Sequence, residues 1–454
     1  MFTLLNNKFL KKDKFFVFLF FFGFALLGAL IFDDYGIAYD ENVQRYIGLN
    51  NYDYIINLFQ GEKIQAAAPA TGVDYPHYGV AFELPLILIE KIFAINNIEN
   101  VYLFRHIFIF FITIFGHVTF FLLLKNKFSS TYLSLFGCFI LIISPRFFAE
   151  GFYNSKDIIF MHSFIICTFF GLKFLKRPDL INSFLFALLT ALSANVRLVS
   201  LLIPIVIFYF IIIKFLRNDY KFSISFNVFT YLFFLFFLLI FFWPFLWTNT
   251  IDNFLYAFFT FKNYDIDLTN FYAGKYMSAQ IIDWYYLPLW IIVTTPFYIL
   301  FFFILNFLKT IQRIIKRMLV IDSKKKFNDL WRGNKELHTL IFFSFIFISI
   351  FSTIIFKSTL YNGWRHFYFI YPFIVILALS EIRTFFHLFK KLRKFLLLFL
   401  FVSIIFQINW MVVNHPHQYV YFNFIGGKKP HLNYEIDYWG LSNKYALIKV
   451  LSSK

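Results

Sequence analysis

The sequence predicts an all-α polytopic membrane protein with about eleven transmembrane helices. Three observations support this fold class. The 454 residues are 60% hydrophobic and only 15% charged, whereas soluble domains carry about 25% charged residues. The apolar runs have the length that an α-helix needs to cross a bilayer, about 20 residues. The charged residues are also divided unequally between the segments that connect these runs.

The expected spans follow each other along most of the chain. The first run comes after Lys11, Lys12 and Lys14 and has no small-residue cleavage pattern at its end. We therefore expect an uncleaved membrane anchor and not a signal peptide. The eleven runs lie at about 15–32, 103–124, 131–145, 158–175, 182–196, 198–216, 226–247, 286–308, 339–356, 366–380 and 395–413.

The charge distribution predicts which side of the membrane each connection faces. With the N-terminus in the cytoplasm and the spans alternating, most of the 42 Lys and Arg residues fall in cytoplasmic connections. Most of the 25 acidic residues fall on the outer side. This is the bias that the positive-inside rule describes. The net charge of +17 is therefore a topology signal, and we expect no nucleic-acid partner.

The long connections divide the chain into regions. Residues 1–413 form the predicted transmembrane domain, and 33–100, 248–285 and the tail 414–454 face outward. The dense carboxylate clusters lie in these three outward segments, so we expect function on the outer face. The basic cytoplasmic loop 309–337 is either an amphipathic membrane-surface segment or a solvated loop.

The first outer loop, 33–100, is expected to contain helices that lie along the membrane surface. Its stretch 78–95, YGVAFELPLILIEKIFAI, is apolar but carries Glu83, Pro85 and Glu90. Three such residues are unfavourable in a membrane span. A surface helix accommodates them.

Four carboxylates occur directly after the first span, in IFDDYGIAYDENVQRYIG (31–48). Asp33 and Asp34 close the span and predict a solvated boundary. Asp40 fits either a helix N-cap or a catalytic base. Glu41 precedes Arg45 by four residues, an order that favours an ion pair on one helix face.

Several stretches together resemble one family. Asp40-Glu41, soon after the first span, resembles the Asp-Glu pair of the protein O-mannosyltransferases and their bacterial relatives, which belong to the GT-C class of membrane glycosyltransferases. YPHYGVAFELPLILIEKIF (75–93) is similar to a family stretch that begins His-Pro-Pro, although here Pro76 precedes His77 and no double proline follows. ISPRFFAEGFYNSKDIIF (143–160), NGWRHFYFIYPFIVILA (362–378) and the tail also resemble bacterial members.

The resemblance implies a GT-C-like fold and an inverting glycosyltransferase without a soluble cofactor. Such an enzyme moves a hexosyl or pentosyl group from a polyprenyl-phosphate donor to a hydroxyl of a protein, lipid or glycan. The resemblance and the topology together place it in the bacterial inner (cytoplasmic) membrane, with its active site on the periplasmic face. The reaction needs a carboxylate that takes the hydroxyl proton and cations that stabilise the departing lipid phosphate.

By this resemblance Asp40 is the general base, Glu41 a support or substrate contact, and Asp157 the second acidic residue of the site. Asp157 also fits a first-turn helix acid, and Glu150 competes for its role in the predicted loop 145–157.

Cationic residues near the outer face are candidates for binding the phosphate or the substrate. Arg365 is the first choice, because a guanidinium binds phosphate with two hydrogen bonds. Arg197 lies near membrane depth, where ionisable groups face a cavity or partner or extend to the interface. The candidates are Arg365, His366, Arg197, Arg146, Lys156 and His77.

No metal site is expected. His415 and His417 are separated by a proline and lack neighbouring carboxylates, and His77 belongs to no helical pair of histidines. Cys138 and Cys167 lie within apolar runs.

Two other functions remain open. A transporter or flippase of lipid-linked sugar would favour internal repeats and mid-membrane charges. A surface-polysaccharide polymerase or ligase would use similar donors.

Overall fold

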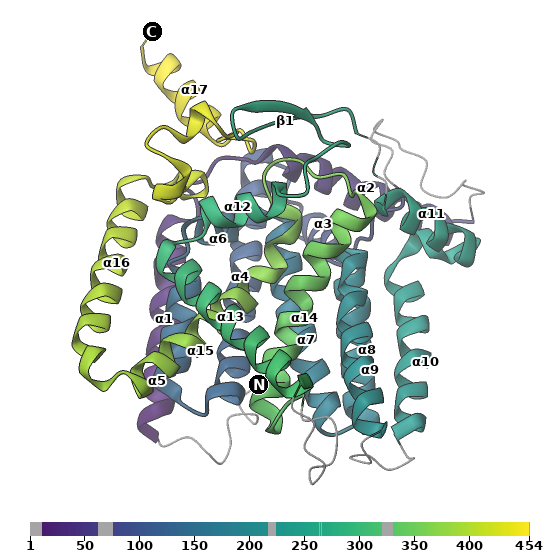
Figure 1. The fold of residues 1–454 in the computed structure, drawn as a ribbon. Coiled ribbons are helices and arrows are strands. Elements are labelled where there is room, and N and C mark those ends of the chain that lie inside the picture. Colours follow the sequence, from purple (N-terminus) through teal and green to yellow (C-terminus); the bar gives the residue numbers. More distant parts are fainter. Residues whose placement is uncertain are drawn as a thin grey trace.

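The computed structural model shows a bundle of long helices that is covered at one end by shorter elements (Figure 1). The described parts of the chain contain 17 α-helices and one two-stranded sheet. Nine of these helices are long and apolar enough to cross a membrane, or ten spans if one bent pair counts as a span. The protein is therefore an all-α, multi-pass membrane protein. The structure describes residues 11–61, 76–216, 224–262, 264, 266–319 and 330–453.

The long helices run between the two ends of the bundle. The bent pair turns by 73° between its two helices. The spans are α1 (Lys11–Ile31), α4 (Ile98–Phe128), α7 (Asp157–Lys176), α9 (Leu202–Leu216), α10 (Ile224–Phe242), α13 (Phe297–Leu319), α14 (Gly333–Phe356), α15 (Tyr371–Leu388) and α16 (Arg393–Val413). The bent pair is α5 (Thr131–Ile142) and α6 (Pro145–Tyr153), and α8 (Leu180–Val196) is a shorter apolar helix.

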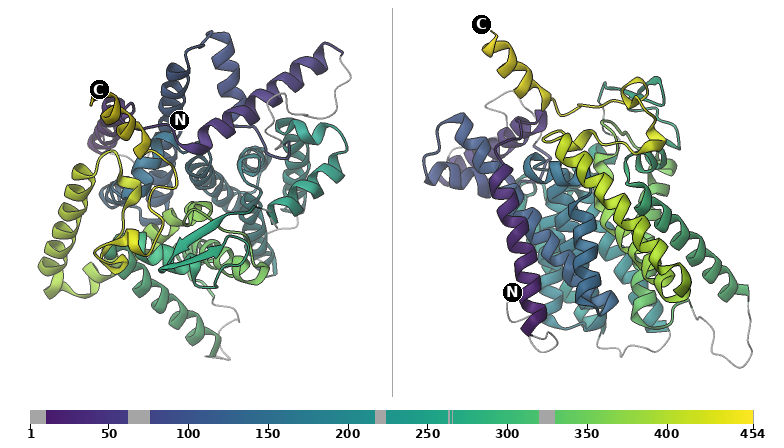
Figure 2. Two further views of the ribbon diagram at one scale, coloured as in Figure 1. Left: turned by 90° about the horizontal axis from the view of Figure 1, so that it is seen from above. Right: turned by 90° about the vertical axis from the view of Figure 1, so that its left-hand side faces the viewer.

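The shorter elements gather at one end of the bundle, which we call the capped end (Figures 1 and 2). β1 and β2 pair antiparallel, with Thr269 opposite Ser278, and Tyr272 of β1 bridges to Tyr434 of the tail. These elements are α2 (Tyr39–Phe59), α3 (Glu83–Ile92), α11 (Thr250–Lys262), β1 (Thr269–Tyr272), β2 (Lys275–Ser278), α12 (Tyr286–Thr294) and α17 (Ser442–Ser452).

The predicted helix within 78–95 is confirmed as α3, but two other expectations are wrong. The segment expected as a loop, 145–157, begins with the helix α6, because Pro145 occupies a first-turn position that favours helix initiation. The run expected as one span, 286–308, breaks at Pro296. A proline disfavours helical conformation in the residue before it, so α12 ends first and the actual span, α13, continues to Leu319. Residues 320–329 of the predicted loop 309–337 lie outside the described residues.

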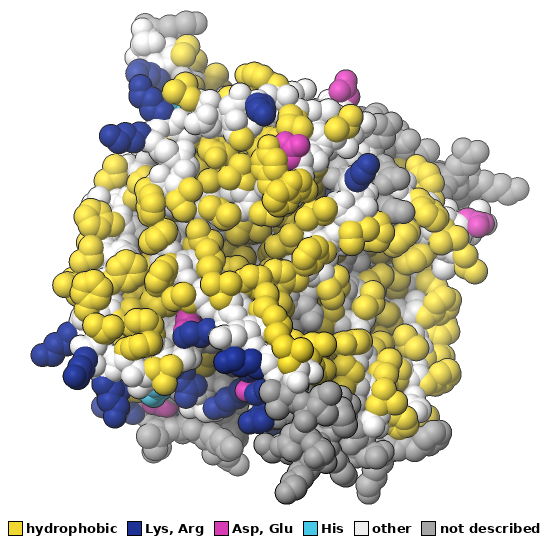
Figure 3. Space-filling model, viewed as in Figure 1, with side chains coloured by type: hydrophobic (Ala, Val, Ile, Leu, Met, Phe, Trp, Pro, Cys, Tyr) yellow, Lys and Arg dark blue, Asp and Glu magenta, His cyan; other side chains and the backbone are white. Residues whose placement is uncertain are grey.

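The distribution of side chains agrees with a bilayer environment. Hydrophobic side chains cover the middle of the visible face in Figure 3, and Lys and Arg gather along the edge opposite the capped end. Exposed large apolar side chains are frequent on α1, α10 and α16, which is the pattern of lipid-facing helices. In contrast α7 is the most deeply buried span.

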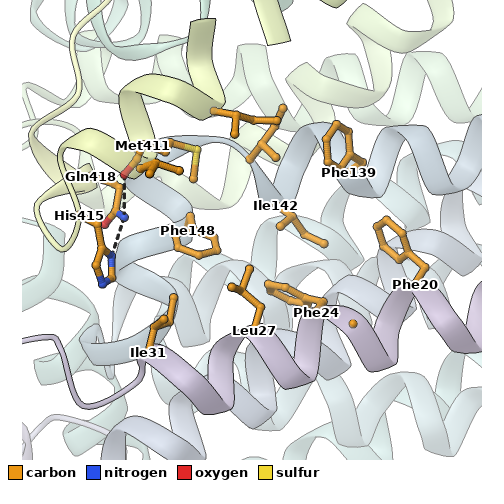
Figure 4. A pocket seen from close by; sticks show the side chains of 14 residues that line it. Phe20, Phe24, Leu27, Ile31, Phe139, Ile142, Phe148, Met411, His415 and Gln418 are labelled. Carbon is orange, nitrogen blue, oxygen red and sulfur yellow. Dashed lines mark hydrogen bonds between the residues drawn. The ribbon is translucent and has the colours of Figure 1, made fainter. Parts of the chain in front are cut away.

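An apolar groove of about 470 Å³ lies between α1, α5, α6 and α16. Figure 4 shows its wall of Phe20, Phe24 and Phe148, with polar side chains at one end only. There His415 and Gln418 are hydrogen-bonded to each other at 2.9 Å. Such a groove suits the hydrocarbon chain of a lipid.

Substitution by alanine is expected to affect stability differently at two glycines of α1. A Cβ at Gly23 would meet no atom within 4 Å, whereas a Cβ at Gly28 would overlap the ring of Phe110. That ring is buried and stacks on Phe152 at 4.6 Å, so it has little room to move. We expect Gly28→Ala to destabilise the protein by about 1–3 kcal/mol and Gly23→Ala to stay within about 0.5 kcal/mol. Thermal unfolding in detergent measures both, and equal midpoints for the two variants would contradict the close packing of α1 on α4.

Candidate functional site

The capped end brings Asp40 and Arg365 together from opposite ends of the sequence. Asp40 is the second residue of α2, and Arg365 begins the 3₁₀-helix Arg365–Ile370. Nη1 of Arg365 donates to Oδ2 of Asp40 at 2.5 Å. The Asp40 side chain is 31% exposed, whereas that of Arg365 is 5% exposed. Asp40 is therefore a carboxylate that a ligand can reach, and its ion pair with the buried Arg365 fixes its position.

The Arg365 guanidinium is held between aromatic rings. Its Cζ lies 4.9 Å from the ring centroid of Trp439 and 5.1 Å from that of Tyr361. Contacts of this kind stabilise a cation and fix its orientation. Trp439 belongs to the tail, so the tail is a structural part of the site.

Asp157 is the second carboxylate of this cluster. It is the first residue of α7 and its side chain is 1% exposed. It forms an ion pair with Arg197, and its Oδ2 lies 4.0 Å from Nη1 of Arg365. Just before α7, Oδ1 of Asn154 accepts a hydrogen bond from the amide N–H of Asp157 at 2.7 Å. Two carboxylates and two guanidiniums thus alternate as Asp40, Arg365, Asp157 and Arg197, which we call the acid–arginine cluster.

Lys156 and His366 lie beside the acid–arginine cluster. Nζ of Lys156 stands 3.4 Å from the ring centroid of Tyr78. Burial, and then the charge of Arg197, lower the pKa of Lys156 well below its usual value. The His366 ring contacts that of Tyr361 edge-on at 4.7 Å. Both predicted cationic candidates therefore lie at the predicted site.

A hydrogen-bonded chain continues from Asp157 into the protein. Nδ2 of Asn154 lies 3.5 Å from Oδ2 of Asp157 and donates to Glu150 at 2.7 Å. Glu150 also accepts a hydrogen bond from the Tyr368 hydroxyl at 2.7 Å. Glu150 is fully buried and reaches Asp157 only through Asn154, whereas Asp157 contacts the arginines directly.

Arg146 lies at the far end of this chain. Its Nη1 donates to the hydroxyl of Tyr438 at 3.5 Å, and Tyr438 contacts Tyr368 at 3.1 Å. Its guanidinium lies over the rings of Trp290 and Phe422, at 5.7 Å and 5.1 Å. Arg146 is 1% exposed, and no ion pair joins it to a carboxylate of the described residues. It therefore reaches the acid–arginine cluster only through other side chains.

Glu41 has different partners from the predicted one. Its Oε1 accepts the amide N–H of Ala38 at 2.7 Å, and its Oε2 lies 3.1 Å from Nε2 of His106. Arg45 instead pairs with Glu90 at 2.9 Å. The predicted Glu41–Arg45 pair is wrong because Glu41 turns back to the start of α2, where free amides need acceptors. The N-cap alternative for Asp40 is also wrong, since Ala38 holds that position.

A buried ion network joins α2, α3 and α4 beneath this segment. Arg105 pairs with Glu83 and, at 3.0 Å, with Glu90. Burial raises the pKa of Glu83, although Arg105 opposes the shift. These contacts hold the helix that carries Asp40 against the membrane bundle.

His77 lies behind the Tyr78 ring. Its ring centroid is 5.0 Å from that of Tyr78, 5.2 Å from Phe261 and 5.8 Å from Tyr256. The predicted phosphate-binding candidate thus packs among aromatic rings. Tyr75 of the same motif lies outside the described residues.

The tail is attached to the end of α1 through Asp34, which contacts His415 of the tail. Nε2 of His415 lies 2.8 Å from Oδ2 of Asp34, and Lys444 donates to the carbonyl of Asp33 at 2.6 Å. The ring of His417 contacts that of Tyr445. Across the described ranges no group of three or more His, Cys, Asp and Glu side chains is arranged to hold a metal ion.

Sequence reasoning missed the aromatic and tail residues of the site. Tyr361 and Trp439 flank Arg365, and Glu435 accepts the amide N–H of Gly363 at 2.6 Å. The run YEIDYWGLS (434–442), dense in acidic and aromatic residues, was the visible signal.

No family model matches the sequence, and no curated protein or solved structure is significantly similar to it. The residues and geometry of the site are therefore the basis on which a function is assigned.

Glu435 predicts a measurable pH dependence of stability. Burial raises its pKa from 4.5 to about 7, although Gly363, Arg365 and Arg146 oppose the shift. The folded state then holds this proton more tightly than the unfolded state, so stability falls as pH rises from about 4.5 through about 7. Glu435→Gln keeps a neutral side chain at every pH. We expect the unfolding midpoint of Glu435→Gln to rise relative to that of the wild type as pH rises from about 5 to about 8. A difference between the two midpoints that stays constant with pH would contradict this.

Proposed function

We propose that the protein is an inverting glycosyltransferase that moves a sugar from a polyprenyl-phosphate donor to an acceptor hydroxyl. The acid–arginine cluster carries this proposal. It combines a partly exposed carboxylate, Asp40, with the buried guanidinium of Arg365 and the partly exposed one of Arg197, at the end of a membrane bundle where a lipid headgroup would lie. We further propose that the capped end faces the periplasm of a bacterial inner membrane, with the N-terminus in the cytoplasm.

In the proposed reaction Asp40 takes the proton of the acceptor hydroxyl as its oxygen attacks the anomeric carbon. The new carbon–oxygen bond forms on the face opposite the bond to the phosphate. That bond breaks, and its electron pair passes to the phosphate oxygen. Inversion follows from this single displacement.

Arg365 and Arg197 are the proposed phosphate ligands. Each forms an ion pair with a carboxylate, so each is already oriented. A donor phosphate would share these guanidiniums with Asp40 and Asp157. Phosphate binding would then loosen the hold of Arg365 on Asp40 and leave that carboxylate available to the acceptor. Arg–phosphate pairs with two hydrogen bonds are strong and directional.

Asp157 is proposed to position both arginines and not to react itself. It is buried and contacts Arg197 and Arg365. Lys156 is proposed to donate a hydrogen bond from its amino group to the departing phosphate.

A transfer assay with purified protein in nanodiscs tests the proposal. Polyprenyl-phosphate sugars are offered with peptide, lipid and glycan acceptors, and the wild type is compared with Asp40→Asn. Asp53→Asn is the matched control, because Asp53 is an exposed residue of the same helix α2. Movement of a lipid-linked sugar across liposomes without transfer would support a transporter instead. Extension of a lipid-linked glycan would support a polymerase.

A further inference from the structure

A basic pocket lies at the end of the bundle opposite the capped end. Its volume is about 200 Å³, and the ends of α4, α7, α9 and α14 surround it. Lys176, Lys214, Lys335 and His338 line it, and no carboxylate is among its lining residues in the described chain. Figure 3 shows Lys and Arg side chains gathered along this end of the molecule.

The nearest acidic side chain in the sequence is already engaged. Glu336 follows Lys335 but binds Arg317 at 2.8 Å and Arg313 at 3.5 Å. It also accepts the amide N–H of Arg332 at 2.5 Å. The positive charge of the pocket is therefore not neutralised by this neighbour.

The first turn of α14 faces the pocket through Asn334 and Lys335. The amides at the start of a helix lack partners within the helix, and the helix dipole adds partial positive charge there. The side chain of Lys127 fixes this turn, because its Nζ donates to the carbonyl of Lys335 at 3.0 Å and to Thr339 at 2.6 Å. Lys127 is itself buried, so the turn is held in place from the protein interior.

His338 is a second observation that supports a ligand site here. Its side chain lines the pocket and is only 8% exposed, and its Nδ1 has no hydrogen-bond partner in the described part of the chain. Buried polar groups are nearly always hydrogen-bonded, and an imidazole nitrogen that carries a proton is a donor to an oxyanion.

We propose that this pocket binds a phosphate group, carried either by the headgroup of an anionic phospholipid or by free phosphate. The volume is several times the roughly 30 Å³ that one water molecule occupies in the liquid, so a phosphate group fits. The ligand would accept hydrogen bonds from the lysines, from His338 and from the first turn of α14. The bound phosphate would join the ends of α7 and α14.

The test compares wild type with the double variant Lys176→Gln/Lys335→Gln. Both lysines are exposed, so their replacement is not expected to affect folding. Lys390→Gln/Lys391→Gln is the matched control, because these exposed lysines join α15 to α16 and do not line the pocket. Unfolding midpoints are measured in detergent with inorganic phosphate or chloride at equal ionic strength, and in nanodiscs of phosphatidylglycerol or phosphatidylcholine.

We expect the effective ligand to raise the unfolding midpoints of the wild type and the control. The pocket variant should need at least about tenfold more of this ligand for the same shift, since charge-assisted hydrogen bonds are lost. A response to phosphate in detergent identifies the free ion as a ligand. A response to phosphatidylglycerol alone identifies the lipid headgroup. Equal responses in all three proteins, or none in the wild type, would overturn the proposal.

Discussion

Replacing Asp40 by Asn is expected to lower the rate of sugar transfer by about 10²–10⁴-fold, the usual contribution of a general base. The amide has nearly the same shape as the carboxylate but accepts no proton. Its oxygen keeps an acceptor for Arg365, which donates to Asp40 at 2.5 Å in the native protein. The change should therefore act on kcat with little effect on stability, as measured by transfer kinetics and thermal unfolding of the same preparation.

Asp53→Asn removes one carboxylate from the exposed surface of α2 and should leave transfer within twofold of wild type, about 0.4 kcal/mol in barrier. Full activity of Asp40→Asn would show that another group takes the proton. Equal losses in both variants would indicate a general effect of charge on α2 and not a reaction at Asp40.

Asp157→Ala is expected to be the most destabilising substitution at the capped end, at about 3–5 kcal/mol. Asp157 is 1% exposed and pairs with Arg197, and it also lies 4.0 Å from Arg365. Its removal leaves Arg197 without its acidic partner and deprives the more deeply buried Arg365 of its second carboxylate. A buried charge without a partner is costly.

The matched control is Asp252→Ala. Asp252 is also a first-turn acid, of α11, but it is exposed, and its loss should change stability by no more than about 0.5 kcal/mol. Removing the partner as well, in Asp157→Ala/Arg197→Met, should restore part of the lost stability, because the double change leaves no unpaired charge from this pair. Strictly additive losses would contradict the ion pair. The single variant Arg197→Met completes this comparison, and chemical or thermal unfolding in one detergent measures all five proteins.

Local properties of the sequence predicted the membrane class and most of the spans. Hydrophobic length decides whether a helix crosses a bilayer, and a run of residues contains that information by itself. The span expected at 158–175 is thus found as α7 (Asp157–Lys176). The run 286–308 failed because a single proline, Pro296, divides an apolar stretch whose composition does not change there.

The sequence by itself also determined which residues were candidates for the site. Asp40, Asp157, Arg197 and Arg365 stood out as charged residues at the ends of apolar runs, where charge is costly unless it has a use or a partner. Only the tertiary structure decided how they pair. Asp40 and Arg365 are 325 positions apart, and their contact depends on how α2 and the 3₁₀-helix before α15 pack at one end of the bundle. Glu41 shows the same dependence, because His106 of α4 and the free amide of Ala38 compete successfully with the nearby Arg45.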